Sequence, residues 1–224
     1  MQTEVVSLGG SILFENNKIS VNYIKNLEKI LSKSNKKFII VLGGGFISRI
    51  YTNALKNSNA KFHDVCKVGM QVTRLNAWIV SRIFELHYED AHLSMADINS
   101  HLKKNKIVIV GALRHTGNMT SDGTAAMIAS HFRTRFINMT NVNGLYDKDP
   151  RKFKDAKLTK EIDYNSFLKI AVKNKFYPGQ HFVLDQKAAH LIKKHKIRTY
   201  IIGKDLNNLR NLLNGKRFIG TTIE

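Results

Sequence analysis

Residues 38–45 read Phe-Ile-Ile-Val-Leu-Gly-Gly-Gly, a short apolar run that passes directly into three glycines. Residues 5–11, Val-Val-Ser-Leu-Gly-Gly-Ser, repeat this order. Each run predicts a buried strand that ends in a tight turn. Because glycine has no side chain, phosphate oxygens can reach the backbone amides of such a turn. A plain strand-to-helix connection explains one such turn equally well, whereas two in the same topological position favour phosphate binding.

The rest of the chain alternates apolar runs with amphipathic stretches. Strands are predicted at residues 5–8, 38–42, 107–110, 136–139 and 199–202. Helices are predicted at residues 20–34, 46–58, 67–87, 122–133, 183–195 and 205–213. This alternation predicts an α/β fold, a three-layer α/β/α sandwich with an open, mainly parallel sheet. Ligands of such sheets bind beyond the carboxyl ends of the strands.

Length and composition predict a single domain that spans residues 1–224. No apolar run approaches the roughly 18 residues that cross a bilayer, and the residues after Met1 lack the pattern of an export signal. We therefore expect no membrane association. The single cysteine, Cys66, excludes an intramolecular disulfide and favours a cytoplasmic location.

The formal net charge is +19, from 36 Lys and Arg residues against 17 Asp and Glu residues. Such an excess favours anionic partners, whether nucleotides, phosphorylated metabolites or nucleic acid. The lysines are scattered over predicted helices with mild clusters at 103–106 and 193–196, and aromatic residues are not interleaved with them. We therefore expect small-molecule nucleotides as partners and no nucleic-acid groove.

Polar loops follow the third and fourth predicted strands. Residues 114–123 read Arg-His-Thr-Gly-Asn-Met-Thr-Ser-Asp-Gly, and Thr120 to Asp122 either cap the following helix or form part of a phosphoryl-transfer site. Residues 140–150 supply hydroxyl, amide, aromatic and carboxylate groups in one loop. The sequence has no Gly-x-x-x-x-Gly-Lys-Ser/Thr motif, so a phosphate cradle here is not a P-loop. The histidines lack the spacing of a metal site, and none is expected.

In order and spacing these motifs resemble the amino acid kinase superfamily and, within it, the archaeal-type uridylate kinases. The matching segments are Leu8–Ser11, Val41–Gly45 with Arg49 and Tyr51, Gly69–Ala77, Thr120–Asp122, 140–150, Asp185 with Ala188 and Ala189, and Gly220–Ile223. The resemblance implies that the γ-phosphoryl group of ATP is transferred to UMP, giving UDP and ADP in pyrimidine nucleotide (CTP/UTP) biosynthesis. It also implies Mg²⁺ bound with the nucleotide and a homohexamer.

The resemblance further implies roles for individual residues. Asp122 and Arg49 are expected to be catalytic. ATP contacts are expected from Ser7, Leu8, Gly9, Gly10, Ser11, Gly45, Arg49, Thr140, Asn141, Tyr146 and Asp149. UMP contacts are expected from Gly44, Asp64, Cys66, His115, Thr116, Gly117, Asn118, Met119, Thr120 and Ser121. Acceptor-binding features thus lie mainly in the N-terminal half and ATP-binding features mainly in the C-terminal half.

One departure from the family pattern concerns the donor side. Ser7 occupies the position at which many members have a lysine, although some archaeal members also lack it. Arg114 and Lys187 are candidates to supply the missing cation. The departure leaves open a noncatalytic nucleotide- or anion-binding homologue, whose basic surface could bind RNA.

Two further departures concern the acceptor side. Cys66 stands where uridylate kinases have the aspartate that binds the UMP ribose, and Asp64 is the nearest carboxylate. The loop between Gly111 and Asp122 is longer than usual and lacks the usual Pro-Gly pair. These changes leave open an ATP-dependent kinase of the same fold that acts on another small phosphate or amine.

Overall fold

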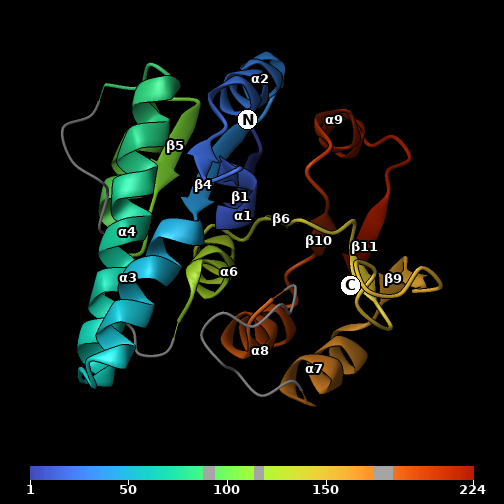
Figure 1. Cartoon of the computed structure of the whole chain (residues 1–224). Helices are drawn as coiled ribbons and strands as arrows, with labels where there is room; N and C mark the ends of the chain where they lie inside the picture. The colour runs from blue at the N-terminus through green and yellow to red at the C-terminus, as the bar shows by residue number, and fades with distance from the viewer. Residues whose placement is uncertain (88–93, 114–118, 174–183) are drawn as a thin grey trace.

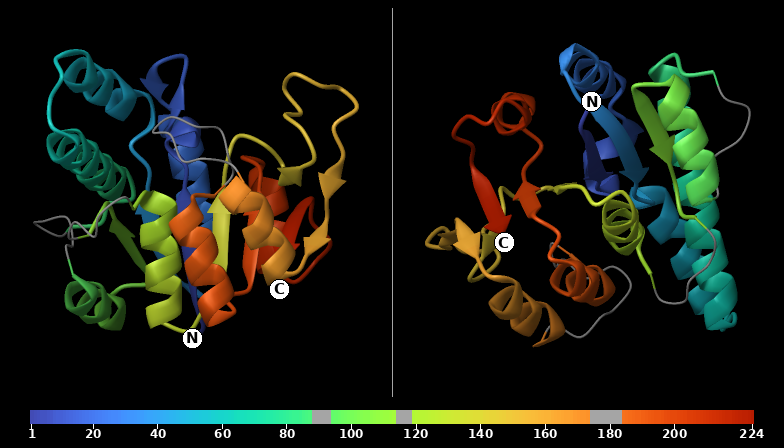
Figure 2. Two further views of the ribbon diagram at one scale, coloured as in Figure 1. Left: turned by 90° about the horizontal axis from the view of Figure 1, so that it is seen from below. Right: turned by 180° about the vertical axis from the view of Figure 1, so that it is seen from behind.

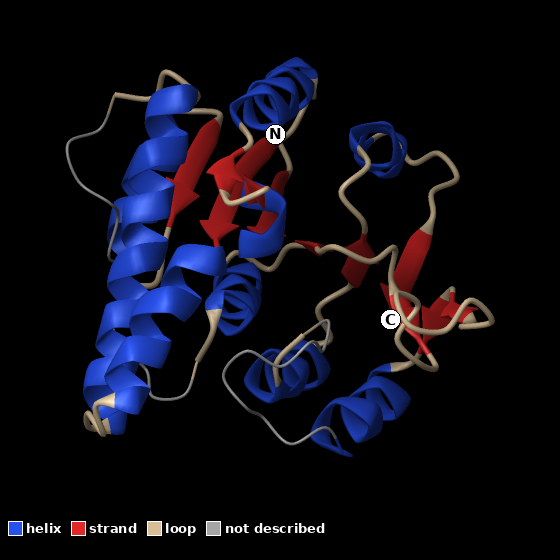
Figure 3. Cartoon of the chain, in the orientation of Figure 1, coloured by secondary structure: helices blue, strands red, loops and turns tan. Residues whose placement is uncertain are grey.

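The structure is a computed structural model that describes residues 1–87, 94–113, 119–173 and 184–224. Its centre is a seven-stranded sheet in the order β5-β4-β1-β6-β10-β11-β9 (Figures 1 and 3). The strands are β1 (Thr3–Leu8), β4 (Lys37–Leu42), β5 (Ile107–Val110), β6 (Phe136–Met139), β9 (Glu161–Ile162), β10 (Thr199–Ile202) and β11 (Gly220–Ile223). The five strands from β5 to β10 in this order are parallel, and β11 is antiparallel to β10.

Helices cover both faces of the sheet, and Figure 1 shows α6, α7 and α8 below it and α2 and α9 above it. The helices are α1 (Gly10–Leu13), α2 (Val21–Lys33), α3 (Gly45–Asn57), α4 (Phe62–Ile83), α5 (Met95–Lys104), α6 (Ser121–His131), α7 (Tyr164–Lys173), α8 (Gln186–His195) and α9 (Leu206–Leu213). Alternate strand residues face two cores. Val5 and Ile39 belong to the core with α5 to α8, whereas Val6 and Ile40 belong to the core with α1, α2, α4 and α9. The predicted fold class is confirmed.

All five predicted strands and six predicted helices occur. The strands at residues 107–110, 136–139 and 199–202 have the predicted bounds, the other elements have shifted ends, and α4 shows the largest shift. It begins at Phe62 instead of residue 67 and ends at Ile83 instead of residue 87. Glu85, just beyond its end, has a left-handed φ of 57°, which a continuing helix does not permit. The predicted start at residue 183 lies outside the described residues, and α8 begins at Gln186.

Helices α5 and α7 and strands β9 and β11 were not predicted. Helix α5 begins with a capping box in which Ser94 and Asp97 each accept a hydrogen bond from the other's backbone N–H, so its start signal is present in the sequence. Strand β11 is Gly-Thr-Thr-Ile and lacks an apolar run. It is recognised as a strand through its pairing with β10 on one side and β9 on the other.

Two hairpins extend from the sheet. One pairs β2 (Phe14–Glu15) with β3 (Lys18–Ile19), and the other pairs β7 (Leu145–Tyr146) with β8 (Leu158–Thr159). The second hairpin follows β6 and carries Tyr146 beside the carboxyl end of the sheet. Within the described parts of the chain, no helix has the length and apolarity needed to cross a membrane.

Candidate active site

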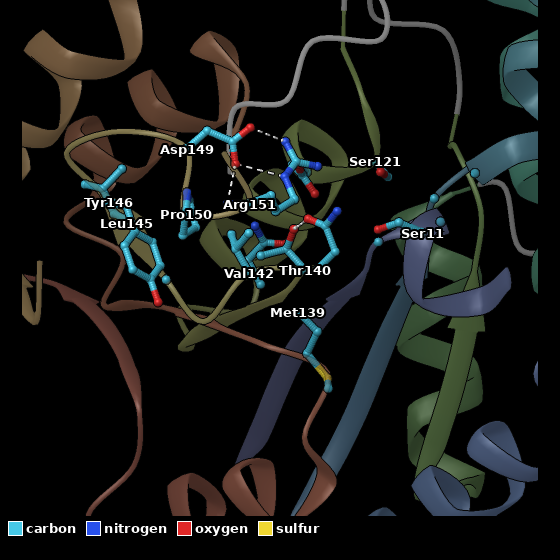
Figure 4. A pocket seen from close by; sticks show the side chains of 18 of the residues that line it. Ser11, Ser121, Met139, Thr140, Val142, Leu145, Tyr146, Asp149, Pro150 and Arg151 are labelled. Carbon is cyan, nitrogen blue, oxygen red and sulfur yellow. Dashed lines mark hydrogen bonds and ion pairs between the residues drawn. The ribbon is translucent and has the colours of Figure 1, made fainter. Parts of the chain in front are cut away.

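A pocket of about 540 Å³ lies beyond the carboxyl ends of β1, β4 and β6, where ligands of parallel sheets bind (Figure 4). Its walls come from both glycine turns, the start of α6 and the loop after β6. The predicted site residues that line it are Gly9, Gly10, Ser11, Gly44, Gly45, Arg49, Ser121, Asp122, Thr140, Asn141, Tyr146 and Asp149. The fold thus brings together residues from four separate parts of the sequence.

The two glycine turns contact each other through their backbones. A Cβ atom on Gly10 would lie 2.1 Å from the backbone N of Gly45, and one on Gly43 would lie 2.6 Å from the backbone N of Gly10. Gly45 also has a φ of 62°, which few other residues adopt. Buried Asn76 of α4 donates from Nδ2 to the carbonyl oxygens of Gly43, at 2.8 Å, and Gly44, at 3.3 Å. The turns therefore form one glycine-dependent unit at the start of α3, where helical N–H groups lack partners.

The same helix, α4, holds the chain where β5 ends. Arg74 donates from Nε to the carbonyl oxygen of Ala112, at 2.9 Å, and from Nη2 to that of Leu113, at 2.7 Å. Thr73 Oγ1 accepts a hydrogen bond from the Ala112 N–H at 2.8 Å. A Cβ atom on Gly111 would lie 2.5 Å from the backbone N of Arg74, so helix and strand end pack backbone to backbone. One helix therefore positions the ends of both β4 and β5.

Two carboxyl groups lie near the adjacent starts of α6 and α8. Ser7 of β1 donates from Oγ to Oδ1 of Asp122 at 2.7 Å. Asp185, the N-cap residue of α8, accepts hydrogen bonds from the backbone N–H groups of Ala188, at 2.9 Å, and Gly123, at 3.0 Å. The side chain of Asp185 therefore ties the two helices together beside Asp122.

Thr120 caps α6, as one of the two sequence interpretations proposed. Its Oγ1 accepts a hydrogen bond from the Asp122 N–H at 3.1 Å and donates one to Oδ2 of Asp185. Ser121, next in the chain, lines the pocket. The segment thus combines a helix cap with side chains that face the pocket, so the two interpretations are compatible.

The pKa of Asp122 is raised from its ordinary value to about 7. Burial of the carboxyl group contributes most, and the negative charge of Asp185 adds to it. The hydrogen bond from Ser7 favours the carboxylate and offsets only part of this increase. Near neutral pH, Asp122 therefore exchanges a proton easily, and a cation brought next to it would favour its ionised form.

Asp149 and Arg151 form an ion pair in the loop that borders the pocket (Figure 4). Arg151 donates from Nε to Oδ1 of Asp149 at 2.9 Å and from Nη2 to Oδ2 at 2.8 Å, and its backbone N–H also donates to Oδ1. These hydrogen bonds lower the pKa of Asp149 to about 2. The carboxylate is therefore ionised and oriented, and a guanidinium group lies at the pocket wall.

Several predicted site residues do not line the pocket. Ser7 and Leu8 are buried in β1, and Leu8 belongs to the apolar core. Met119 and Thr120 directly precede the lining residue Ser121. The remaining predicted UMP contacts, which lie outside the described residues, are His115, Thr116, Gly117 and Asn118.

Cys66 and Asp64 also lie outside the pocket, near the start of α4. At about 100° per residue, Cys66 lies on the side of the helix that includes Gly69, which packs on α3. Asp64 is exposed and lies about 160° away around the helix axis. Because α4 is continuous through both positions, the helix does not place Asp64 where Cys66 lies. Their contacts with UMP stay predictions.

Eleven lining residues were not among the predicted contacts. They are Gly43, Asn138, Met139, Val142, Gly144, Leu145, Asp147, Lys148, Pro150, Arg151 and Ile170. Lys148 lies in the polar loop at residues 140–150 and Arg151 directly follows it. The polar character of this loop could therefore have indicated both residues as candidate contacts. Ile170 comes from α7, a helix that the sequence did not predict.

The pocket combines features suited to binding and transferring phosphate. Backbone amides of the glycine turns, the start of α3 and the cations Arg49, Lys148 and Arg151 border one space, and the Asp122 carboxyl faces it. Across the described ranges, no group of three His, Cys, Asp or Glu side chains could hold a metal ion. The amides and cations that border the pocket therefore fit a phosphorylated ligand.

We expect the effect of Asp122→Asn on the stability of the ligand-free protein to depend on pH, and to be more favourable at pH 8 than at pH 5. Because the pKa is about 7 in the folded state and ordinarily 3.8, folding retains a proton that the unfolded chain releases. This contribution to stability is complete below about pH 4 and is lost as the pH rises through about 7. The free energy of unfolding of the variant, relative to the natural protein, should rise by about 1–3 kcal/mol between pH 5 and 8 in denaturant titrations.

Ser7→Ala tests the same prediction, because it should shift the pH dependence of stability in a known direction. It removes the hydrogen bond that favours the carboxylate, so the loss of stability should shift to higher pH. Parallel stability curves for Asp122→Asn and the natural protein would contradict the raised pKa.

Comparisons with known proteins agree with this geometry. Residues 2–203 match the amino acid kinase family. The uridylate kinase of Thermococcus onnurineus is 33% identical over 227 residues, which cover 98% of this chain and 98% of the relative. The uridylate kinase of Methanopyrus kandleri is 32% identical over 228 residues, with the same coverage of both chains.

A solved structure extends the similarity to three dimensions. The uridylate kinase from Archaeoglobus fulgidus superposes with a TM-score of 0.84 at 27% identity and covers 100% of both chains. The resemblance inferred from the glycine turns and the polar loops is therefore confirmed. This chain belongs to the amino acid kinase family.

Proposed function

We propose that this protein is a uridylate kinase, which transfers the γ-phosphoryl group of ATP to UMP and yields UDP and ADP for pyrimidine nucleotide (CTP/UTP) biosynthesis. The observation that carries the proposal is the pocket, where two contacting glycine turns and the half-buried Asp122 line one space. The full-length relatives named uridylate kinase support UMP as the acceptor.

In this proposal ATP lies between the glycine turns and the loop after β6. The triphosphate would contact the backbone of Gly9, Gly10, Ser11 and Gly45, together with Ser7 and Leu8 at the end of β1. The adenosine would lie along Thr140, Asn141, Tyr146 and Asp149. Tyr146 is half-buried and Asp149 is already ionised, so the loop offers an aromatic ring and a carboxylate for the base and the ribose. Support comes from the common pocket that these residues border.

Arg49 would supply the positive charge that a lysine in place of Ser7 would otherwise provide, whereas Nε and Nη2 of Arg151 already donate to Asp149. Arg49 is exposed on α3 beside the glycine turns, and Arg151 borders the pocket from the loop after β6. Guanidinium groups bind phosphate through paired hydrogen bonds. Of the candidates from sequence, Arg114 lies outside the described residues, and Lys187 on α8 is not a lining residue.

Asp122 would organise the phosphoryl-transfer centre together with Mg²⁺. Magnesium is commonly held by one or two carboxylates and the phosphates of the substrate, a mode that the single Asp122 carboxyl at the pocket fits. The ion would neutralise charge on the transferring phosphoryl group. Asp122 would orient the phosphates, Ser7 would hold Asp122, and the backbone amides would align donor and acceptor.

UMP would bind on the side of Gly44 and the start of α6. Ser121 borders the pocket there, and Met119 and Thr120 precede it. The segment 115–118 is expected to complete this side. Of the two predicted contacts on α4, Cys66 would approach the ribose because it shares the side of the helix that packs on α3, whereas Asp64 lies on another side.

A second candidate function keeps the ATP site and changes the acceptor. The observation that favours it is Cys66, a thiol at the position where the family pattern has a ribose-binding aspartate. A thiol accepts hydrogen bonds weakly, and loss of a charge-assisted bond costs about 1.5–3 kcal/mol. Another small phosphate or amine would not require that bond.

We also propose a cytoplasmic homohexamer. Large apolar side chains are exposed on α3 and α4: Ile50, Tyr51, Phe62, Leu75 and Trp78. Contiguous exposed apolar surface commonly marks a protein interface. Sedimentation velocity at micromolar concentration should give the mass of six chains, and a monomer would contradict the proposal.

We expect Gly45→Ala to abolish ATP binding. The new Cβ would lie 2.7 Å from the carbonyl oxygen of Gly10 and 2.8 Å from the ring of Phe14, and the positive φ adds strain. The two glycine turns would have to separate. Isothermal titration with an ATP analogue should show a loss of at least about tenfold in affinity.

Gly215→Ala is the matched control, because Gly215 also has a positive φ, 68°, but no atom lies within 4 Å of an added Cβ. This variant should lose only about 1 kcal/mol of stability and bind ATP normally. Equal loss of binding in both folded variants would contradict the role of the turn contact.

The acceptor is tested by ADP release in the presence of UMP, other nucleoside monophosphates and small phosphorylated metabolites. UMP should give the highest kcat/KM. Cys66→Asp should lower the KM for UMP by about ten- to a hundredfold, because it adds a charged acceptor for the ribose hydroxyls. Asp64→Ala, on another side of α4, should leave this KM unchanged.

Turnover of another acceptor at a higher kcat/KM, with UMP kinetics unaffected by Cys66→Asp, would contradict the uridylate assignment and support the second candidate. ATP binding without turnover of any acceptor would contradict both and leave a noncatalytic homologue.

A further inference from the structure

The edge of the sheet opposite the pocket, where β4, β5, β6 and β10 begin, carries a row of cations; we call it the amino edge. Backbone hydrogen bonds place the row in order. The backbone N–H of Phe38 donates to the carbonyl oxygen of Lys106 at 2.8 Å. In the same way, the N–H of Val5 donates to that of Arg135 at 3.2 Å, and the N–H of Phe136 donates to that of Arg198 at 3.0 Å. Lys36 and Lys37 lead into β4, between Lys106 and Arg135 in the sheet order. Figure 2, left, shows the N-terminus of the chain at this edge.

Four helices add cations to the amino edge, because α2, α5, α6 and α8 each run toward the start of the next strand. Side-chain hydrogen bonds confirm the proximity. Lys106 Nζ donates to the carbonyl oxygen of Ser32 in α2, and Lys37 Nζ donates to the carbonyl oxygen of Leu102 in α5. The Lys and Arg residues in or just after the last turns of these helices are Lys33, Lys103, Lys104, Arg133, Lys193, Lys194 and Lys196. The two lysine clusters that the sequence separates by ninety residues thus lie on one edge.

Acidic groups at the amino edge are few, and three of them already make interactions within the chain. Glu4 is fully buried and accepts hydrogen bonds from Lys36, at 2.7 Å, and Arg135. Glu224 pairs with Arg198, and Asp163, at the outer end, caps α7. The lysines of the helix ends form no ion pair with an acidic residue in the described ranges. The amino edge therefore keeps a large positive excess.

Helix stabilisation explains only part of this excess. A cation near a helix C-terminus contributes about 0.3–1 kcal/mol and acts within the last turn. One such residue per helix would suffice, whereas α8 ends with Lys193, Lys194, His195 and Lys196 in succession. Crowded like charges repel each other, so their accumulation needs another explanation, such as an anionic partner.

The amino edge has little apolar surface to offer a partner. The large exposed apolar side chains of α3 and α4 lie on another surface of the molecule. Among the described residues, Met1 is the large exposed apolar side chain adjacent to the amino edge. Protein interfaces usually have an apolar centre, and peripheral membrane segments usually insert apolar side chains. Both classes of partner therefore fit poorly.

We propose that the amino edge binds the phosphate backbone of a nucleic acid, contrary to the expectation from the scattered lysines of the sequence. Five parallel strands about 4.8 Å apart make the row about 20 Å long, which matches several successive phosphates at about 3.4 Å each. Lysine and arginine contacts to phosphate bind without reading sequence. The interaction is independent of the proposed kinase activity, because the row and the pocket lie at opposite ends of the same strands.

The test measures binding of fluorescently labelled single-stranded RNA, single-stranded DNA and duplex DNA of about 20 nucleotides by anisotropy over a range of salt. The edge variant combines Lys104→Glu, Lys193→Glu and Lys194→Glu. Its affinity should fall at least about tenfold, and the slope of log K against log salt should decrease by about 2–3, close to one unit per lysine. The RNA and DNA arms identify which nucleic acid binds more tightly.

The matched control combines Lys18→Glu, Lys25→Glu and Lys154→Glu, three exposed lysines on other surfaces. Both variants change the net charge equally, from +19 to +13, because each substitution removes two charges. The control should keep nearly full affinity, and the edge variant should retain its ADP release with UMP. Equal losses in both variants, no binding by the natural protein, or binding only to anionic phosphatidylserine vesicles would each overturn the proposal.

Discussion

The backbone contact between the turns at Gly10 and Gly45 is the constraint on which the rest of the site depends. Strands β1 and β4 are parallel neighbours with Leu8 opposite Leu42, so their glycine turns emerge side by side. Helix α3 starts from the second turn, and α4 packs against α3 and returns Asn76 to the turn's carbonyl oxygens. Any side chain between the turns would separate them. The close approach of the turns therefore sets how β1, β4, α3 and α4 meet at the pocket.

The sequence predicts the features of the fold that are encoded locally. The strands at residues 5–8 and 38–42, and the turns that follow them, could be recognised because apolar runs and glycines are adjacent in sequence. The contacts of Arg74 could not, because they join α4 to carbonyl oxygens 38 and 39 residues away, and no local pattern encodes them. Arg151 was not predicted as a site residue for a related reason, since only folding places its loop opposite the glycine turns.

The hydroxyl group of Ser7 affects the electrostatics of the site as well as its contacts. A hydroxyl group donates a hydrogen bond to Asp122 but brings no charge, so burial and Asp185 raise the pKa of the carboxyl. The ionised form is favoured only when a cation arrives, which the metal-bound nucleotide would supply. The charge balance of this site would therefore be completed by the substrate, whereas a resident lysine would complete it in advance.

The two ends of the sheet can serve different anions because distance and solvent separate them. Strand β1 has six residues, so its ends lie about 20 Å apart, whereas exposed charges are screened over about 8 Å at physiological salt. The lysines of the amino edge therefore affect the ionisation of Asp122 little. Parallel topology also explains why both ends are electropositive. Helix starts and glycine turns gather at the carboxyl end, while basic helix ends gather at the other, so one strand arrangement yields two electropositive surfaces of different chemistry.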